Sequence, residues 1–311
     1  MKAQLQLLES KLNSVLIGKP EVVRLCLIAL LSRGHLLIED IPGIGKTTLA
    51  QGLSRLIDLK FQRIQFTSDL LPSDILGVAV YLQTKEVFEF KPGPIFNSII
   101  LADEINRATP RTQSALLEAM QERQVSIEGQ TYPLPDPFFV IATQNPIEHY
   151  GTYPLPDSQL DRFLLSIKIG YPVEECELEV LKTRSYGVIT DQLSPVVDGS
   201  HLLALQQEVE KVRIDDSLLQ YILKIMQATR TRPQVRIGAS PRAGLGLKQS
   251  AKAIAFMEGR DYIIPDDIKR MAAAVLRHRL VLKQEIFEPE KKNQQAEAMI
   301  SEILDSIPVP I

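Results

Sequence analysis

The sequence predicts an α/β protein in which a five-stranded parallel sheet, covered by helices, is followed by a smaller all-helical domain. Three observations predict this fold. Short apolar runs alternate with helical or loop material, which is typical of a parallel sheet buried on both faces. A glycine-rich loop connects the first run to a helix, and only helical patterns follow residue 172. The expected strands are residues 36–38, 63–66, 99–102, 138–143 and 163–169.

Two helices are expected before the first strand. Leu5, Leu8, Leu12 and Val15 recur at helical spacing, so the first segment predicts an amphipathic helix. A second helix is expected over residues 21–31, because the preceding proline suits a first helical turn.

Two segments exceed a minimal α/β unit. Residues 68–96 contain three prolines and predict a helix plus a hairpin inserted before the strand at 99–102. Residues 124–137 alternate apolar and polar side chains around Gly129, which predicts a second hairpin. Segments of this length in a compact domain are more often functional than idle.

The C-terminal part is expected to be helical. Proline and acidic residues at the beginnings of two of its segments match the first turns of helices. Residues 187–200 are the expected linker, so we predict an α/β domain over 1–190 and a helical domain over 191–311. The expected helices after the last strand are residues 174–185, 201–212, 216–229, 241–258 and 265–278.

Composition narrows the functional classes. The 311 residues are 45% hydrophobic and 23% charged, which predicts a folded chain with a proper core. The net charge of −3 implies no strong overall attraction to nucleic acid. Cys26 and Cys176 lack metal-ligand or redox spacing, which argues against structural zinc and a disulfide framework. No apolar run is long enough for a membrane span and the N-terminus is too polar for a signal peptide, so a cytoplasmic protein is expected.

The glycine-rich loop has the composition of a phosphate-binding loop. Its glycines let successive backbone N–H groups point at phosphate oxygens, and the helix behind it adds a favourable dipole. We expect Lys46 to reach the β- and γ-phosphates and the Thr47 hydroxyl to hold Mg²⁺. The full pattern has glycine where this chain has Asp40, and a chance glycine turn before a helix is the alternative. The expected phosphate-binding residues are Pro42, Gly43, Ile44, Gly45, Lys46, Thr47 and Thr48.

An acidic pair follows the apolar run at 99–102. Asp103 is expected at the carboxyl edge of the sheet, where ligands of open α/β sheets bind. It would hold Mg²⁺ through water, and Glu104 would polarise the water that attacks the γ-phosphate. Alone the pair could be a solvated strand end, but after a phosphate loop it favours hydrolysis over transfer to another substrate.

Three further polar residues are candidates. Asn145 ends another expected strand, where it could orient the attacking water; a turn-forming Asn before proline is the alternative. Arg162 begins a strand away from its own loop, so it could reach a neighbouring subunit's nucleotide; a surface pair with Asp161 is the alternative. Arg242 opens a helix of the second domain and could reach back to the γ-phosphate, although a cation opposes the dipole there.

Taken in order, these motifs resemble the AAA+ ATPases: Walker A at 42–48, Walker B at 99–104, sensor 1 at Asn145, an arginine finger at Arg162 and sensor 2 at Arg242. The residues of these motifs most resemble those of the MoxR family, which belongs to the helix-2-insert clade. Its fingerprints are Asp-Glu-Ile-Asn-Arg-Ala at 103–108, Gln-Ser-Ala-Leu-Leu-Glu-Ala-Met-Gln-Glu at 113–122, Ala-Thr-Gln-Asn-Pro at 142–146, Gln-Leu-Asp-Arg-Phe at 159–163 and Ser-Pro-Arg at 240–242.

The resemblance covers residues 15–279 and implies a P-loop AAA+ core with a helical lid. It implies Mg-dependent hydrolysis of ATP to ADP and phosphate, with Ile17 and Gly18 beside the adenine. The segments 68–96 and 124–137 resemble the helix-2 insert and the pre-sensor-1 hairpin of that clade. Arg107 also matches a family position, where a structural salt bridge is at least as plausible as a direct role.

The resemblance further implies a homo-hexameric ring that remodels or matures a separate client protein, in some cases one with a von Willebrand factor A domain. The four histidines are scattered, so no metal site is expected beyond nucleotide-bound Mg²⁺.

A nucleic-acid-associated AAA+ motor or loader is the alternative function. The acidic balance and the lack of a basic tail argue against it. A small-molecule kinase or a GTPase switch fits less well, because a kinase lacks the Asp-Glu ending and a GTPase carries an Asn-Lys-x-Asp string that this chain does not have.

Overall fold

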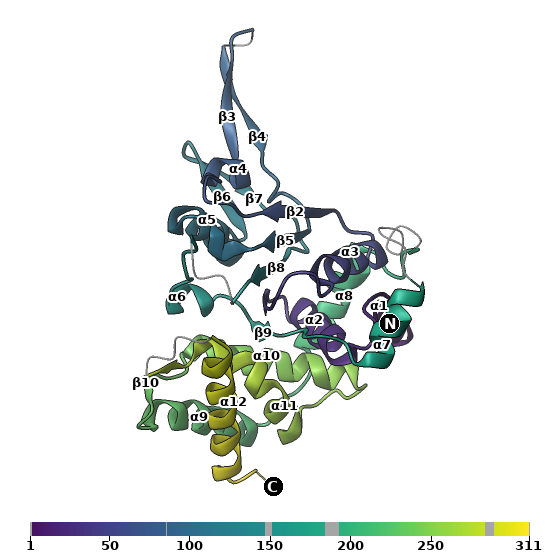
Figure 1. The fold of residues 1–311 in the computed structure, drawn as a ribbon, viewed down its shortest axis with the longest axis vertical. Coiled ribbons are helices and arrows are strands. Elements are labelled where there is room, and N and C mark those ends of the chain that lie inside the picture. The colour runs from purple at the N-terminus through teal and green to yellow at the C-terminus, as the bar shows by residue number, and fades with distance from the viewer. Residues whose placement is uncertain (1, 85, 147–150, 184–192, 284–288, 311) are drawn as a thin grey trace.

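A five-stranded, fully parallel sheet forms the centre of the N-terminal part (Figure 1). The computed structural model describes residues 2–84, 86–146, 151–183, 193–283 and 289–310. The strands are arranged in the order β2-β5-β8-β1-β9, which confirms the predicted sheet. Their bounds are β1 Leu36–Glu39, β2 Phe61–Gln65, β5 Ile99–Asp103, β8 Phe139–Gln144 and β9 Leu165–Ile167.

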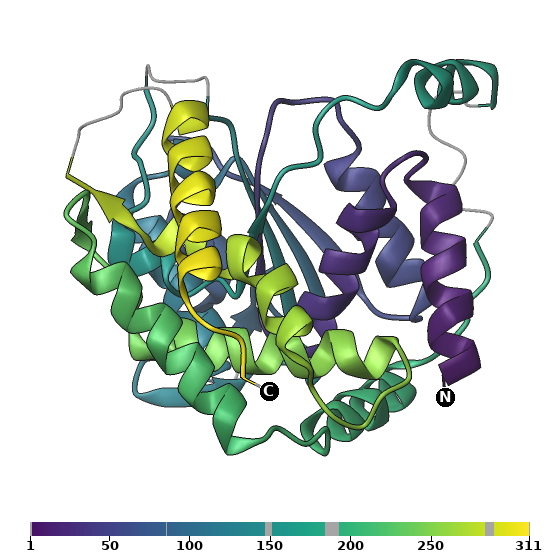
Figure 2. The ribbon, with the colours of Figure 1, turned by 90° about the horizontal axis from the view of Figure 1, so that it is seen from below.

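Both faces of the sheet are buried, which is why its strands are continuous apolar runs. In β5, Ile99 and Leu101 belong to the larger apolar cluster, whereas Ile100 and Ala102 belong to the cluster on the opposite face. This alternation is the two-residue period of a strand. The helices α1 Lys2–Val15, α2 Pro20–Leu31 and α3 Lys46–Leu56 cover the first face, and α5 Pro110–Glu122 covers the second (Figure 2).

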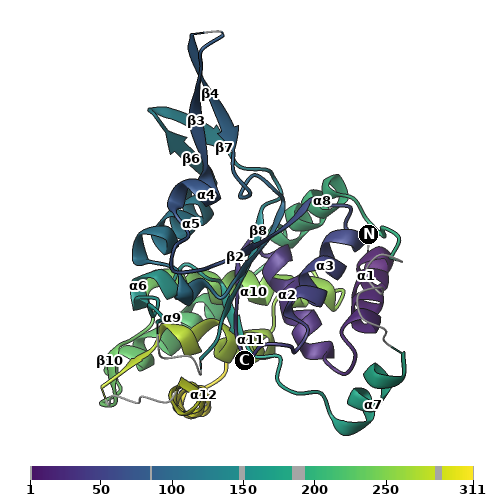
Figure 3. The same cartoon turned by 45° about the horizontal axis from the view of Figure 1, so that its top comes forward.

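Both predicted insertions are confirmed as hairpins that project from the body (Figure 3). The first consists of α4 Pro72–Leu76, β3 Gly77–Leu82 and β4 Val87–Pro92, and the second of β6 Gln124–Ile127 and β7 Gln130–Pro133. The rings of Phe90 and Tyr132 stack with centroids 4.1 Å apart. Because this stack joins β4 to β7, the two hairpins support one another at their bases.

The C-terminal part is helical, as predicted, with one addition. The short strands β10 Val235–Ile237 and β11 Val281–Leu282 pair antiparallel, so "all-helical" needs this correction. Two or three residues are too few for a strand period to stand out in a sequence. The predicted domain boundary at 190–191 lies outside the described residues. The helices are α7 Glu174–Thr183, α8 Gly199–Glu210, α9 Asp216–Thr231, α10 Pro241–Met257, α11 Pro265–Leu276 and α12 Pro289–Ser306.

Local chemistry fixes where these helices begin. The side chains of Asp198, Asp215 and Ser240 accept hydrogen bonds from backbone N–H groups in the first turns of α8, α9 and α10. Each cap satisfies a donor that would otherwise lack a partner. Helix α12 was not predicted, because its first half is strongly polar and shows no apolar period. The described residues also include a short helix, α6 Asp157–Leu160, and the 3₁₀ turns η1 Ile105–Arg107 and η3 Arg277–Arg279.

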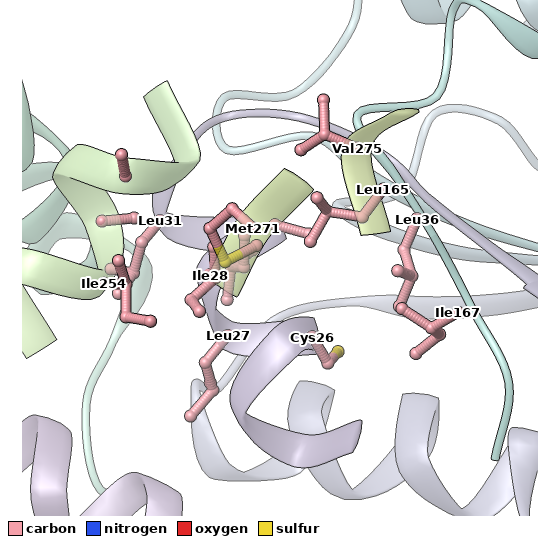
Figure 4. Packing of buried hydrophobic residues seen from close by; sticks show 14 of the residues in the cluster. Cys26, Leu27, Ile28, Leu31, Leu36, Leu165, Ile167, Ile254, Met271 and Val275 are labelled. Carbon is pink, nitrogen blue, oxygen red and sulfur yellow. The ribbon is translucent and has the colours of Figure 1, made fainter. Parts of the chain in front are cut away.

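One apolar cluster runs from the N-terminal helices to the C-terminal ones. In it, Leu27 and Leu31 of α2 lie with Leu165 of β9 and with Ile254 and Met271 of α10 and α11 (Figure 4). The side-chain amide of Gln206 on α8 also donates to the carbonyl of Leu30 at 2.8 Å. The helical part is therefore packed against the edge of the sheet that carries β9.

No helix in the described part of the chain combines the length and the apolar character that crossing a bilayer requires.

His35, which precedes β1, is buried as a neutral ring. Burial lowers its pKa from 6.5 to about 4, and the nearby charge of Arg123 acts in the same direction. Its Nδ1 accepts from the N–H of Val140 at 3.0 Å, which leaves Nε2–H to donate to the carbonyl of Met120 at 3.2 Å. Both ring nitrogens are therefore satisfied only in the neutral form.

This ring gives a testable pH dependence. The unfolded chain binds a proton near pH 6.5 and the folded chain only near pH 4, so the stability that neutral His35 confers is complete above pH 6.5 and falls as the pH drops towards 4. Between pH 7 and pH 5 we expect the free energy of unfolding to fall by about 2 kcal/mol from this group. Urea titrations of the wild type and of His35→Gln at both pH values measure it. Between pH 7 and pH 5 the free energy of unfolding of His35→Gln should fall by about 2 kcal/mol less than that of the wild type. Equal losses in the two proteins would contradict the assignment of a neutral, buried His35.

Candidate nucleotide site

The loop between β1 and α3 has the backbone that a phosphate-binding loop needs. Gly43 and Gly45 have φ values of 86° and 96°, in the left-handed region that favours glycine. A Cβ on Gly45 would also lie 2.8 Å from a methyl group of Leu16. The helix begins at Lys46 directly after the second glycine. The predicted strand–loop–helix arrangement is therefore confirmed, and the N-terminus of α3 faces the space above the loop.

A cavity of about 410 Å³ lies over this loop. Its wall includes all seven expected loop residues, 42–48, together with Arg63 of β2, Asp103 of β5 and Glu104 directly after β5. A second group of lining residues comes from the turn after α1, from the segment that leads into α7 and from α7 itself: Leu16, Ile17, Lys19, Gly170, Pro172 and Val180. The cavity thus has polar, loop-lined walls together with more apolar ones, as a phosphorylated ligand with an organic ring requires.

Lys46 lies at the centre of the polar part and is almost completely buried. Its ammonium donates to the carbonyl oxygen of Asp40 at 2.7 Å. Burial lowers the pKa of Lys46, while the carboxylates of Asp103, Asp40 and Glu104 act in the opposite direction. The cation is therefore held among acids at the loop, where a phosphate could replace the carbonyl as its partner.

Asp103 is fixed at the end of β5 by two neighbouring strands. One carboxylate oxygen accepts from the Thr143 hydroxyl of β8 at 2.6 Å, and the other accepts from Nε and Nη2 of Arg63 on β2 at 3.1 and 2.5 Å. Thr47 lines the same cavity. A hydroxyl and a carboxylate are hard oxygen donors of the kind that Mg²⁺ prefers, so this pair fits the predicted metal role.

Glu104 lines the cavity beside Asp103 and has an unusual backbone, with φ at 57°. Its N–H donates to the Thr143 hydroxyl at 2.9 Å. Its Oε2 accepts from the Gln65 amide at 2.7 Å and from Arg107 at 2.9 Å. Arg107 therefore makes the salt bridge that was one of its two predicted roles. Because Glu104 lines the cavity, its carboxylate can accept a hydrogen bond from a water there.

Three residues of the site were not predicted from the sequence: Arg63, Gln65 and Thr143. Arg63 and Gln65 lie on β2, and Gln65 is paired in register with Asp103. Only the strand order places β2 beside β5, and that order cannot be read from local patterns. Thr143, in contrast, lies in the predicted strand two residues before Asn145, so a polar side chain in an otherwise apolar strand was an available signal.

Asn145 directly follows β8, which lies between β5 and β1 in the sheet. Its side chain is buried, and its carbonyl accepts from the Asn106 side chain at 3.4 Å. It is at the expected edge of the sheet but does not line the cavity.

Of the two residues expected near an adenine, Ile17 lines the cavity and Gly18 does not. Gly18 has φ at 75°, and a Cβ there would lie 2.7 Å from the sulfur of Cys176. Gly18 therefore allows the turn after α1 to pack closely against α7, which is a supporting role for the wall and not a lining one.

Arg162 and Arg242 are both outside the lining of the cavity. Arg162 lies in the turn between α6 and β9, and the guanidinium of Arg242 donates to the side chain of Gln121 at the end of α5 at 3.3 Å. The expectation that Arg242 reaches back to its own loop is not met in this arrangement. The reason is that the beginning of α10 is attached elsewhere.

That attachment is the side chain of Asp161. It accepts from Arg279 Nε at 2.7 Å and from the Ser240 hydroxyl at 3.0 Å, and Arg279 is almost fully buried. A salt bridge of this kind is costly to break, because a single substitution leaves a buried charge alone. Since Asp161 is next to Arg162 and Ser240 is two residues before Arg242, one cluster positions both arginines.

Two family models match the chain. The model of the ATPase family associated with various cellular activities (AAA) matches residues 35–165, and that of the AAA lid domain matches residues 227–303. The first range contains the loop and both acidic residues of the cavity. The second contains Arg242 and the helices that follow it.

Similar proteins extend over nearly the whole chain. The Bacillus subtilis protein named "Uncharacterized protein YeaC" is 49% identical over 302 residues, which are 96% of this chain and 93% of that protein. "Chaperone MoxR1" of Mycobacterium tuberculosis is 42% identical over 309 residues, 96% of this chain and 81% of that protein. A crystal structure of a "putative ATPase" from Cytophaga hutchinsonii matches with a TM-score of 0.90 at 40% identity, over 100% of this chain and 96% of that one.

Proposed function

Because the chain belongs to the MoxR-type AAA+ ATPases, we propose that it uses Mg²⁺-dependent hydrolysis of ATP to remodel or mature a separate client protein. The chain is an ATPase with a P-loop core and a helical lid. The observation that carries the proposal is the meeting of Lys46, Thr47, Asp103 and Glu104 in one cavity over the phosphate loop.

Each of these residues has a role in that proposal. The loop N–H groups and Lys46 bind the β- and γ-phosphates, for which Lys46 exchanges the Asp40 carbonyl for a phosphate oxygen. Thr47 and Asp103 would hold Mg²⁺, which supplies charge neutralisation on the phosphates. Glu104 orients a water and accepts its proton as the water attacks the γ-phosphorus. Asn145, at the same edge of the sheet, would help orient that water.

Arg162 and Arg242 are proposed to complete the site of the neighbouring subunit in a homo-hexameric ring. Two observations support this. Neither guanidinium lines the cavity of its own subunit, and the cluster around Asp161 brings both arginines to one region of the surface. A cation placed at a neighbour's γ-phosphate would stabilise the charge that develops during hydrolysis.

The client is proposed to be another polypeptide, because "Chaperone MoxR1" is similar over 96% of this chain. We also propose that this client polypeptide contains a von Willebrand factor A domain. A nucleic-acid client is the alternative, and the net charge of −3 argues against it.

A trapping experiment tests the client proposal. Glu104→Gln with Mg²⁺ and ATP should retain partners in a pull-down, because it binds nucleotide without turning it over. The matched control is Lys46→Ala, which lacks the phosphate-binding cation and should retain none of them. Partners identified by mass spectrometry should be proteins, and removal of Mg²⁺ should release them. Retention of nucleic acid, lost at higher salt, would reverse the assignment in favour of a motor or loader.

A further inference from the structure

Asp40 occupies the position where the phosphate-loop pattern has glycine, and both its carboxylate and its backbone carbonyl accept hydrogen bonds. One carboxylate oxygen accepts from the backbone N–H groups of Ile169 and Gly170, both at 2.7 Å. The other accepts from the N–H of Ile41 at 2.9 Å, and its carbonyl accepts from Lys46. Asp40 is buried at 8% exposure. A glycine in this position would provide the carbonyl but none of the carboxylate contacts.

The segment that Asp40 holds is a wall of the cavity. We call residues 169–172 the strap; they follow β9 and lead into α7. Gly170 and Pro172 of the strap line the cavity, and Gly170 has φ at 65°, which turns the chain there. A second contact holds the same segment, because Lys19 donates to the carbonyl of Tyr171 at 2.6 Å. The strap therefore has no regular secondary structure of its own and depends on these side chains for its position.

The strap belongs to the less polar part of the lining. The phosphate-binding part is formed by residues 43–48 with the two acids, whereas Leu16, Ile17, Pro172 and Val180 provide apolar surface. Phosphates suit the first part and an aromatic base suits the second. Asp40 links the phosphate-binding part of the lining directly to the apolar part. Loss of its carboxylate would therefore move the apolar part without removing any phosphate-binding group.

We propose that Asp40 is a positioning residue that holds the strap as the wall against the base and ribose of the nucleotide. This inference rests on the proposed ATP site. The carboxylate accepts three backbone N–H groups, two of them from the strap, and such donors are costly to leave without partners when they are buried. Aspartate at position 40 therefore adds recognition of the organic part of the ligand to a loop that recognises phosphate.

Binding of three ligands separates this role from an effect on the loop. Dissociation constants of the wild type, Asp40→Gly and Asp40→Asn are measured by calorimetry for ATP, ADP and inorganic tripolyphosphate, each with Mg²⁺. Asp40→Gly restores the common loop pattern and removes the strap contacts, so we expect ATP and ADP to bind about tenfold more weakly or worse. Tripolyphosphate has no base, and its affinity should stay within about twofold of the wild type. Asp40→Asn keeps one uncharged acceptor, so its affinities for ATP and ADP should lie between those of the wild type and those of Asp40→Gly.

Lys46→Ala is the matched control, because it should weaken binding of ATP and of tripolyphosphate alike. Equal losses of ATP and tripolyphosphate affinity in Asp40→Gly would overturn the inference, since they would mean that Asp40 acts through the loop. Unchanged ATP affinity would overturn it as well. Failure of the wild type to bind either ligand would instead refute the ATP site. Thermal melting checks that Asp40→Gly is folded, and if it is not, Asp40→Asn carries the test with the same ligands.

Discussion

Glu104→Gln is expected to bind ATP with nearly normal affinity and to hydrolyse it ~10²–10⁴-fold more slowly, the usual contribution of a general base. The amide has the shape of the carboxylate, so it can still accept hydrogen bonds from Gln65 and Arg107. It cannot accept a proton from the attacking water. The phosphate-binding groups of residues 43–48 are untouched, which is why binding and turnover should separate.

Phosphate release at saturating ATP and the ATP dissociation constant are the two measurements. Glu118→Gln is a matched control, because Glu118 is exposed on α5 and lies outside the lining of the cavity. It should change neither quantity. Normal turnover by Glu104→Gln would remove Glu104 from the role of base, and loss of ATP binding would mean that the residue supports the cavity instead.

Arg162→Ala is expected to bind ATP normally and to lose turnover by ~10³–10⁵-fold, the range for an arginine that stabilises charge on a transferred phosphoryl group. Arg162 does not line the cavity of its own subunit, so its effect is expected through a neighbour. Adding Lys46→Ala subunits should restore part of the activity, because these subunits carry an intact Arg162 next to working sites of the Arg162→Ala subunits.

Steady-state hydrolysis across a range of mixing ratios checks this expectation. Arg213→Ala is the control: Arg213 makes an exposed ion pair with Asp261, and such pairs contribute little. Restoration that follows the fraction of mixed rings supports a shared site. Full turnover by a sample that is strictly monomeric would refute it, as would activity of the mixture that equals the sum of its components.

The sequence predicted the sheet well because its signals were local. Each strand is a short apolar run buried on two faces, and the loop glycines are required by their own φ values. Lys46, Asp103 and Glu104 were found for the same reason, since each directly follows or begins a recognisable element. The cavity confirms that they lie together.

The residues that could not be predicted depend on contacts between distant segments. Gln65 meets Glu104 only because β2 pairs with β5, and Asp40 meets the strap across about 130 residues of chain. The contact of Arg242 with Gln121 was not predicted, because the helix of Arg242 was considered alone. A hydrogen bond from Ser240 to Asp161, 79 residues apart, attaches the beginning of that helix to the turn before β9, and no local pattern reveals this contact.

The apolar cluster shared by α2, β9, α10 and α11 makes the lid a poor candidate for independent movement or exchange. A hinge inside the subunit would have to expose side chains such as Leu31 and Met271, which are now buried against each other's helices. Exposing that much apolar surface is expensive in water. We therefore expect each subunit to move largely as a rigid block during a catalytic cycle. Movements that do mechanical work would then occur at the interfaces between subunits. We also expect that a helical lid transplanted from a relative would pack poorly on this chain unless α2 and β9 of that relative were transplanted with it.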